Sequence, residues 1–518
     1  MTFLPIVARE LRVAARRRST YAVRGLAAVA AIAVCGWRFM AGGQWPSAAS
    51  MGQSLFGVLA GLALGFCLLV GFYLSADCLS AEKRDGTLGL LFLTDLKGHD
   101  VVLGKLAAHS VSAFYGLLAF VPMMSLPLML GGVAFGEVAR MTLVLLNALL
   151  FSLAAGVLVS ALCRQERTAL AWSLFLVFLV GAVLPFVGEV FTGRARTNLI
   201  VAFGLPSPVA AFRLASQKPF AGAAAFFWLS LLCTLGLSLA CLAAASAIVQ
   251  RVWHEKGTSI RAQRWRGRWQ QWRFGNAAQR QLLRTRLLDE NPFLWLAGRD
   301  RSKQAVAWGA LVAAAGLWLW GYRAMGHNWL AACTVPTAFA VHGFLKIWLA
   351  SEASARLAED RHSGALELLL STPLTGREIL RGQCRALERI FKWPVGVVIG
   401  ADVVLWWSGG LHEFALPIVL MVVMLLVDLY ALTWVAMWLG VSLGGPGRAL
   451  VSTIVRVLAV PSVVFAALAL VVGPGANSSG LVVLWFVVGL FTSLPLATVA
   501  HGQLLRLRAL AAGPLARL

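Results

Sequence analysis

Long apolar runs alternate with short polar segments over almost the whole chain. A helix that crosses a lipid bilayer needs about 20 mostly apolar residues. Runs of roughly that length occur at 22–41, 53–76, 109–133, 139–162, 168–190, 221–248, 304–323, 329–351, 391–408, 416–443, 450–473 and 481–503. This pattern predicts an all-α polytopic membrane protein with twelve transmembrane helices. The first run lacks a small-residue cleavage site and further runs follow it, so we expect it to be retained.

Lys and Arg residues orient the predicted spans, because the cytoplasmic loops of membrane proteins are enriched in them. If the N-terminus is cytoplasmic, the segments on that side hold 34 of the 45 Lys and Arg residues. The outer loops then hold only 4, all within 191–220. We therefore predict that the N- and C-termini are both cytoplasmic.

The composition agrees with a membrane protein and disfavours other classes. Hydrophobic residues make up 59% of the chain and charged residues 13%, against about 25% charged residues in soluble domains. The net charge of +23 would suggest a nucleic-acid partner in a soluble protein. Here the charge asymmetry across the membrane accounts for most of it, so we expect no nucleic-acid partner. Neither a Cys-x-x-Cys pair nor a His and acidic cluster with metal-ligand spacing occurs, so no metal site is predicted.

Two polar, leucine-rich stretches are copies of one motif. Residues 82–100 and 359–378 each follow the second predicted span of their half. From Gly86 onward a constant offset of 278 residues relates the copies, whereas Arg84 aligns with Arg361 at 277, which implies one inserted residue. A polar loop has no packing reason to recur in this way. The repeat therefore predicts a duplicated gene with a duplicated docking role.

Further matches extend the repeat over both halves of the chain. Asn147 matches Asp428 and Arg167 matches Arg448, both at an offset of 281. Six spans follow six spans with the same orientation, which is a parallel repeat. We predict a first six-span half at 1–249, a basic linker at 250–290 and a second six-span half at 291–518.

The linker contains a tryptophan stripe with arginines beside it. Trp265, Trp269 and Trp272 recur at helical spacing, which is typical of a helix lying in the membrane interface. RNA-binding segments use the same residue types. The position between two membrane halves favours lipid, since anionic headgroups attract arginine.

Each repeated stretch is predicted to form a helical elbow. Gly86 and Gly364 can end the preceding helix and turn the chain, and a short leucine-rich element follows. Thr94 and Thr372 are then expected to cap the helix that leads into the third span. An elbow without any partner is the alternative, but it would not explain the recurrence of the polar residues.

The motif Glu-x-Arg…Gly-Thr/Ala-Leu-x-Leu-Leu-x-x-Thr-x-Leu-x-Gly-x-Glu/Asp resembles the loop after the second span in ABC-2-type permeases of ATP-binding-cassette transporters. The strongest resemblance is to the group named for multicopper-enzyme maturation. It implies that both loops are coupling helices that dock on a separate ATPase subunit, present in two copies. The coupling positions that it implies are Glu82, Arg84, Gly86, Thr87, Leu88, Leu91, Thr94, Glu359, Arg361, Gly364, Leu366, Glu367, Leu369, Thr372 and Pro373.

The resemblance further implies a permease subunit of an exporter in the inner membrane. The chain has no Gly-x-x-x-x-Gly-Lys-Ser/Thr segment, which is the loop that cradles nucleotide phosphates. We therefore expect ATP and Mg²⁺ to bind the partner, and the chain itself not to be an enzyme. The second copy is nearer to the family pattern, because Glu367 and Pro373 stand where the first copy has Gly89 and Asp95.

Polar side chains inside predicted spans are candidate functional groups. Asp402 and Asp428 lie well inside spans, and Asn147 aligns with Asp428. They either join helices by hydrogen bonds or line a transport pathway, with Arg456 and Lys346 as candidate partners. An ion-coupled secondary transporter would need such groups at mid-membrane. A membrane anchor for an ATPase that does assembly work would share every other feature, so both alternatives stay open.

Overall fold

The computed structural model describes residues 47–93, 96–185, 204–252, 270–300, 302–408, 415–443, 445–472 and 478–506, together with a few isolated positions before 37 and at 267–268. Throughout these residues the regular structure is helical and no strand is present. The predicted all-α class is therefore confirmed. Of the predicted first span, 22–41, only scattered helical positions are among the described residues.

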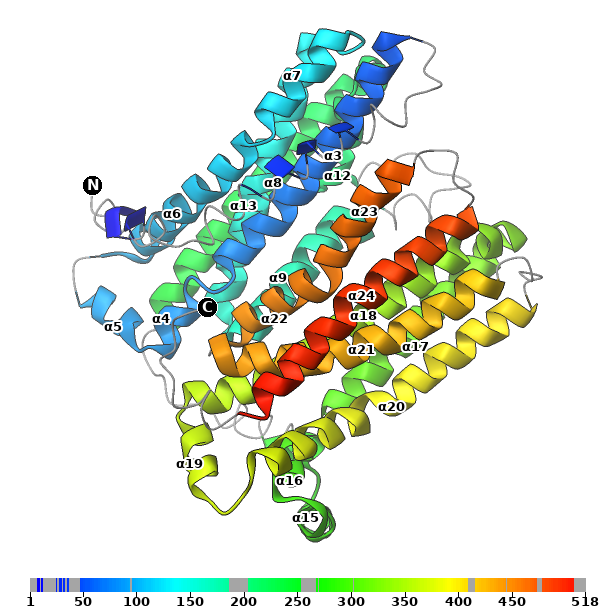
Figure 1. Ribbon diagram of the computed structural model, residues 1–518. Helices are drawn as coiled ribbons and strands as arrows, with labels where there is room; N and C mark the ends of the chain where they lie inside the picture. The colour runs from blue at the N-terminus through cyan, green and yellow to red at the C-terminus, as the bar shows by residue number, and fades with distance from the viewer. Residues whose placement is uncertain are drawn as a thin grey trace. The chain divides into compact units, whose positions relative to one another are not determined.

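The chain divides into two compact units, Met1–Lys256 and Gly257–Leu518. The division falls inside the segment predicted to be a linker. Figure 1 shows long helices running side by side within each unit.

In the first unit the helix α8 is central. It packs most extensively against α3 and α13, and these contacts enclose an apolar core. The elements of this unit are α3 (Ala48–Ser75), α4 (Ser80–Arg84), α5 (Thr87–Phe92), α6 (Gly98–Leu118), α7 (Val121–Leu130), α8 (Phe135–Leu162), α9 (Glu166–Phe178), the π-helical turn η1 (Leu179–Val183), α12 (Pro208–Ala215) and α13 (Gln217–Val252).

In the second unit α21 has the corresponding place, because it packs most extensively against α18 and α24. The elements are α15 (Ala277–Glu290), α16 (Pro292–Gly298), α17 (Ser302–Met325), α18 (His327–His362), α19 (Ala365–Ser371), α20 (Gly376–Ser408), α21 (Ala415–Leu443), α22 (Pro446–Ile454), the π-helical turn η3 (Val455–Ala459), α23 (Val460–Val472) and α24 (Ser478–Leu504). Both units thus have a π-helical turn within the predicted fifth span.

Eight helical segments among the described residues are long and apolar enough to cross a membrane. They are Ala48–Arg84, Gly98–Leu130, Phe135–Leu162, Pro219–Arg251, Ser302–Arg323, Leu416–Leu443, Pro446–Phe465 and Ser479–Leu504. The predicted spans 329–351 and 391–408 lie within the long helices α18 and α20. The chain is therefore a multi-pass membrane protein, and the number twelve stays a prediction.

Candidate functional site

The first copy of the motif folds as an elbow of two short helices. The helix α4 ends at Arg84, and α5 begins at Thr87 after a turn at Gly86. Gly86 has φ +71°, a left-handed conformation that only glycine adopts readily. On α5, Leu88 is buried at 4% exposure, whereas Leu90, two residues later, is 63% exposed.

The second copy folds in the same way. Gly364, with φ +74°, separates the end of α18 from α19. Leu366 is fully buried and Leu368 is 71% exposed. Each elbow is thus anchored by one leucine and presents another to the surface. The prediction that the two glycines turn the chain is confirmed.

The exit from each elbow is capped by an acidic side chain. In the first unit Asp100 Oδ2 accepts a hydrogen bond from Lys97 N at 3.0 Å. In the second unit Glu378 Oε2 accepts one from Thr375 N at 2.7 Å, and Glu378 N donates to Thr375 Oγ1 at 3.3 Å. Asp100 and Glu378 are related by the same offset of 278. These caps start α6 and α20.

The predicted cap at Thr372 is wrong. Thr372 follows the end of α19, and its hydroxyl donates back to Leu369 O at 2.6 Å. The Thr375-x-x-Glu378 sequence is a capping box, in which two orphan backbone donors are satisfied reciprocally, and this pattern was visible in the sequence. Thr94, the other predicted cap, lies outside the described residues.

Basic side chains tie each elbow to the C-terminal end of the predicted fourth span. In the second unit Arg361 Nη1 donates to Val441 O near the end of α21. In the first unit Lys83 Nζ donates to Ala161 O near the end of α8. Cations are favourable where the unpaired carbonyl groups of a helix end collect. Arg361 is buried, so it holds the elbow against the unit.

Arg84 has a different role from the one that its alignment with Arg361 predicts. Its two terminal nitrogens each lie 2.8 Å from an oxygen of Asp77, and it also donates to Arg164 O at 3.4 Å. In this structure Lys83 makes the contact that corresponds to that of Arg361. These contacts favour an offset of 278 through this region, without the predicted inserted residue.

The buried acid of the motif follows the same register. Glu82, at 7% exposure, lies 2.8 Å from Lys105 Nζ and accepts a hydrogen bond from the Thr87 hydroxyl. At an offset of 278 its counterpart is Asp360, which is buried, and not Glu359, which is exposed. Lys105 is replaced there by Gln383, whose buried Oε1 has no hydrogen-bond partner among the described residues.

Among the described residues, the counter-ion of Asp360 is Arg356. Its Oδ2 is 3.2 Å from Arg356 Nε, one helical turn away on α18. Burial raises the pKa of Asp360, and the charge of Arg356 offsets this only partly. The second elbow is therefore held mainly through Arg361 and Leu366, without the buried lysine of the first.

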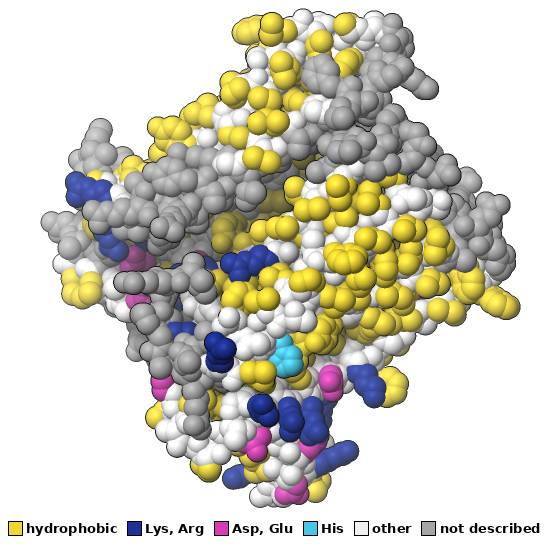
Figure 2. Space-filling view, viewed as in Figure 1, with side chains coloured by type: hydrophobic (Ala, Val, Ile, Leu, Met, Phe, Trp, Pro, Cys, Tyr) yellow, Lys and Arg dark blue, Asp and Glu magenta, His cyan; other side chains and the backbone are white. Residues whose placement is uncertain are grey.

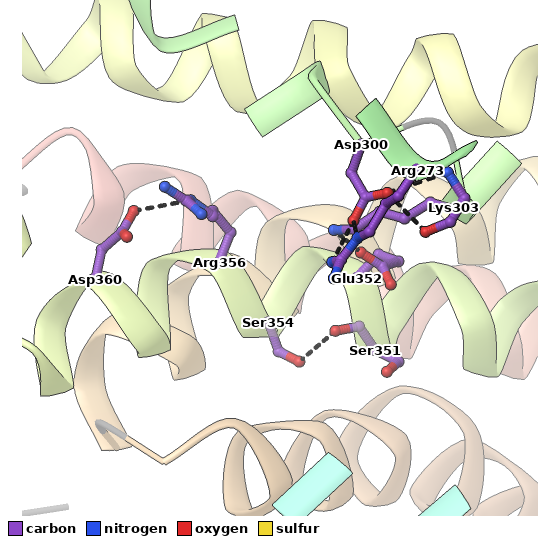
Figure 3. A network of polar contacts seen from close by, with 9 residues as sticks. Arg273, Asp300, Lys303, Ser351, Glu352, Ser354, Arg356 and Asp360 are labelled. Atoms are coloured by element: carbon purple, nitrogen blue, oxygen red, sulfur yellow. Dashed lines mark hydrogen bonds and ion pairs between the residues drawn. The ribbon is translucent and has the colours of Figure 1, made fainter. Parts of the chain in front are cut away.

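A polar network reaches from this end of α18 to the segment before α17 (Figure 3). Arg356 and Glu352 lie one turn apart on α18, and Glu352 pairs with Lys303 on α17. Asp300, just before α17, accepts a hydrogen bond from Arg273 Nε at 2.7 Å. These pairs join three successive parts of the second unit next to the elbow.

Asp300 also binds the first residue of α17, Ser302. Its Oδ1 accepts hydrogen bonds from Ser302 N at 3.0 Å and Ser302 Oγ at 2.6 Å. Burial raises the pKa of Asp300, but the hydrogen bonds and charge of Arg273 and the bonds from Ser302 outweigh burial, so the pKa lies below its usual value. Asp300 is thus a charged anchor between Arg273 and the helix.

The surface of the elbows consists of a subset of the predicted coupling residues. Glu359, Glu367, Thr372 and Pro373 are exposed, whereas Leu369 and Thr87 are half-buried. The side chain of Leu91 is not among those described. The most exposed apolar residues of the elbows, Leu90, Leu368 and Leu93 (77% exposed), were not among the predicted coupling positions. Their spacing from the buried leucines, on a helix of about two turns, is the signal that could have found them.

The polar residues inside predicted spans join helices in both units. In the second unit His342 Nε2 lies 2.8 Å from Asp402 Oδ2, and Lys346 Nζ lies 2.8 Å from Asp428 Oδ2. Ser493 on α24 donates to Asp428 Oδ1 at 3.3 Å. In the first unit Asn147 Nδ2 donates to Leu231 O at 2.8 Å.

Among the residues that sequence singled out as partners, Lys346 pairs with Asp428, whereas Arg456 lies over the Trp438 ring at 5.7 Å. Of the predicted tryptophan stripe, Trp272 is 51% exposed on a helical segment. Trp265 and Trp269 lie outside the described residues.

The helical architecture and the apolar spans define a multi-pass membrane protein. Residues 5–255 match the family model described as an ABC-2 family transporter protein. This match extends over nearly the whole first unit and confirms the prediction of an ABC-2-type permease, whereas the multicopper-maturation group stays a prediction. No match to a curated protein was found.

A solved structure titled as an outward-facing conformation of a multidrug resistance MATE family transporter of the MOP superfamily matches 97% of this chain and 98% of its own. The identity is 14% and the TM-score 0.33. A likeness this weak carries no argument about fold or function.

Proposed function

We propose that the chain is the membrane-spanning subunit of an ABC-2-type exporter and that its two elbows dock on separate ATPase subunits. The observation that carries the proposal is the paired arrangement of Leu88 and Leu90 on one elbow and Leu366 and Leu368 on the other. In each pair the first leucine is buried and the second is largely exposed. An exposed apolar side chain on a rigid, anchored turn is suited to a pocket on another protein.

The remaining predictions belong to the same proposal. Two parallel six-helix repeats, with the boundaries given above and both termini in the cytoplasm, would place both elbows on the side where ATP is available. The ATPase subunits, in two copies, would bind ATP and Mg²⁺. Their closure would push on α4–α5 and α18–α19, and the chain would reside in the inner membrane as part of the multicopper-maturation group.

The test is copurification with the ATPase subunit from mild detergent. Leu368→Asp should reduce the recovered ATPase about tenfold or more, because burying an unpaired carboxylate in an apolar pocket is strongly unfavourable. Leu282→Asp on α15 is the matched control, since Leu282 is 72% exposed and lies outside the elbows. If no ATPase copurifies with the unaltered chain, or if both variants behave alike, the docking role is wrong.

An ion-coupled secondary transporter is the second candidate. It is favoured by the pairs His342–Asp402 and Lys346–Asp428 inside the predicted spans of the second unit, because coupling ions bind such groups. Uptake into proteoliposomes driven by a pH gradient, without any ATPase, would support this alternative. An anchor for an ATPase that does assembly work would give copurification without any transported solute.

A further inference from the structure

An arginine-rich cavity lies in the second unit, in the segment that precedes α17. Its volume is about 470 Å³, within the range of small-molecule sites. It is lined by Phe274, Arg280, Gln281, Leu283, Arg284, Trp295 and Arg299. Three guanidinium groups and two aromatic rings thus line one cavity, and no carboxylate is among the described residues that line it.

These three arginines carry uncompensated charge. The neighbouring acid, Asp300, is engaged by Arg273 and Ser302. Within the part of the chain that the structure describes, Arg280, Arg284 and Arg299 have no ion-pair partner. The cavity therefore has a positive field that an anion would neutralise.

Aromatic rings hold two of the arginines in place. The guanidinium carbon of Arg299 lies 5.9 Å from the ring centres of both Phe274 and Trp295. That of Arg284 lies 5.8 Å from Trp295. Such cation–π contacts orient the planar forks without using up their hydrogen-bond donors.

A second cavity beside α15 also contains arginines but differs from the first in the acids that line it. The second cavity, of about 740 Å³, also contains arginines, but Glu290 and Glu388 line it as well. Arg385 lies 2.7 Å from Glu290. Its positive charge is thus partly neutralised from within, unlike that of the first cavity.

The first cavity also lies next to a membrane-spanning helix. Arg299 lies three residues before the start of α17. The segment Ser302–Arg323 of this helix is apolar enough to cross a bilayer. Trp272 and Leu282, close to it in the chain, are 51% and 72% exposed. Figure 2 shows Lys and Arg side chains gathered at the end of this unit where α15 and α16 lie, beyond the apolar surface of the helices.

We propose that this cavity binds the phosphate headgroup of an anionic phospholipid from the adjacent leaflet. Arginine forks bind phosphate oxygens bidentately, and the aromatic and leucine wall suits the glycerol and first acyl carbons at the interface. Free phosphate compounds share the phosphate chemistry. The exposed apolar residues and the adjoining span favour the lipid.

The experiment uses the full-length protein, stripped of lipid in detergent, and measures retention of phosphatidylglycerol against phosphatidylcholine by native mass spectrometry. The unaltered protein should prefer phosphatidylglycerol. The double variant Arg284→Gln/Arg299→Gln should lose about tenfold in that preference, since two charge-assisted contacts are removed. The control, Arg286→Gln/Arg389→Gln, makes the same charge change in the second cavity and should keep the preference.

Two further arms make the result decisive. Inorganic phosphate or glycerol 3-phosphate that displaces the lipid at equal concentration would overturn the lipid assignment in favour of a soluble phosphate compound. An equal loss in the two double variants would show diffuse charge attraction and also overturn the site. If Arg284→Gln/Arg299→Gln does not fold, Arg284→Lys/Arg299→Lys keeps both charges without the forks and should still weaken the preference, whereas an unchanged preference would refute the fork model.

Discussion

The two units use different chemistry to support the helix that leads into the elbow. In the first unit the second-span helix is interrupted between α3 and α4, and serines of α8 satisfy the freed backbone. Ser160 Oγ accepts from Leu79 N and Ser80 N, each at 2.9 Å. Ser152 Oγ accepts from Phe72 N at 2.8 Å and donates to Leu68 O at 2.6 Å, so it is inserted into a helical hydrogen bond.

In the second unit the corresponding helix α18 is continuous from His327 to His362. It carries two polar side chains, His342 and Lys346, which pair with acids on α20 and α21. Thr433, the counterpart of Ser152, donates to Leu429 O of its own helix. The common features are the elbow, its buried leucine and its exposed leucine. The comparison therefore teaches that the two units share the elbow, its acidic cap and its basic contact to the fourth-span helix. They differ in how the preceding helix is supported and in the partner of the buried acid.

The largest expected effect concerns the buried charges of the second unit. Asp428→Ala leaves the half-buried Lys346 without its counter-ion and should destabilise the unit by about 3 kcal/mol. The double variant Lys346→Met/Asp428→Leu should recover most of the loss. Asn147→Ala in the first unit should cost about 1 kcal/mol or less. Thermal unfolding in detergent measures all three, and equal losses at Asp428 and Asn147 would contradict the contrast.

The next largest difference in stability is expected between variants of the buried acids of the two elbows, Glu82 and Asp360. Glu82→Gln removes the charge that neutralises buried Lys105 but keeps an oxygen acceptor, so we expect a loss of about 2 kcal/mol. Asp360→Asn should cause no loss at neutral pH, because the raised pKa of Asp360 means that its ionised form is disfavoured in the folded protein. The same unfolding measurement compares the two variants.

The raised pKa of Asp360 also predicts the direction in which the unfolding free energy changes with pH. An acid whose folded-state pKa is raised binds its proton more tightly when folded, so it favours folding more as the pH falls and less as the pH rises through the raised pKa. Asp360→Asn should remove this dependence. Gln383→Lys, which restores the lysine of the first unit, should reverse it, and an unchanged profile in both variants would refute the assignment of Asp360 as the counterpart of Glu82.

A smaller difference in unfolding free energy is expected when the hydroxyl groups of Ser160 and Thr433 are removed. Ser160→Ala leaves two buried backbone donors without an acceptor and should cost about 1–3 kcal/mol. Thr433→Ala removes only a hydroxyl bonded within its own helix and should change the unfolding free energy by less than about 0.5 kcal/mol. Comparable losses from the two variants would show that the break in the first unit needs no such support.

Sequence reasoning found the elbows because the motif recurs after 278 residues and because Gly86 and Gly364 are strong local turn signals. It misplaced the cap at Thr372, although Thr375 and Glu378 form a recognisable capping box. It could not tell whether Glu359 or Asp360 is the counterpart of Glu82. These two acids are adjacent in the chain, and only the burial of their side chains distinguishes them. The π-helical turns and the pairing of Lys346 with Asp428 depend on tertiary packing, which no single stretch of sequence encodes.

The central claim is that both elbows are equivalent docking points. It is tested most directly by replacing residues 86–93 with the sequence of 364–371, and by measuring ATPase activity of the purified complex with its partner. The exchange keeps the glycine, the buried leucine and the exposed leucine, so the account predicts activity within about twofold of the unaltered complex. Loss of the partner or of its activity, with the chain still folded, would contradict it.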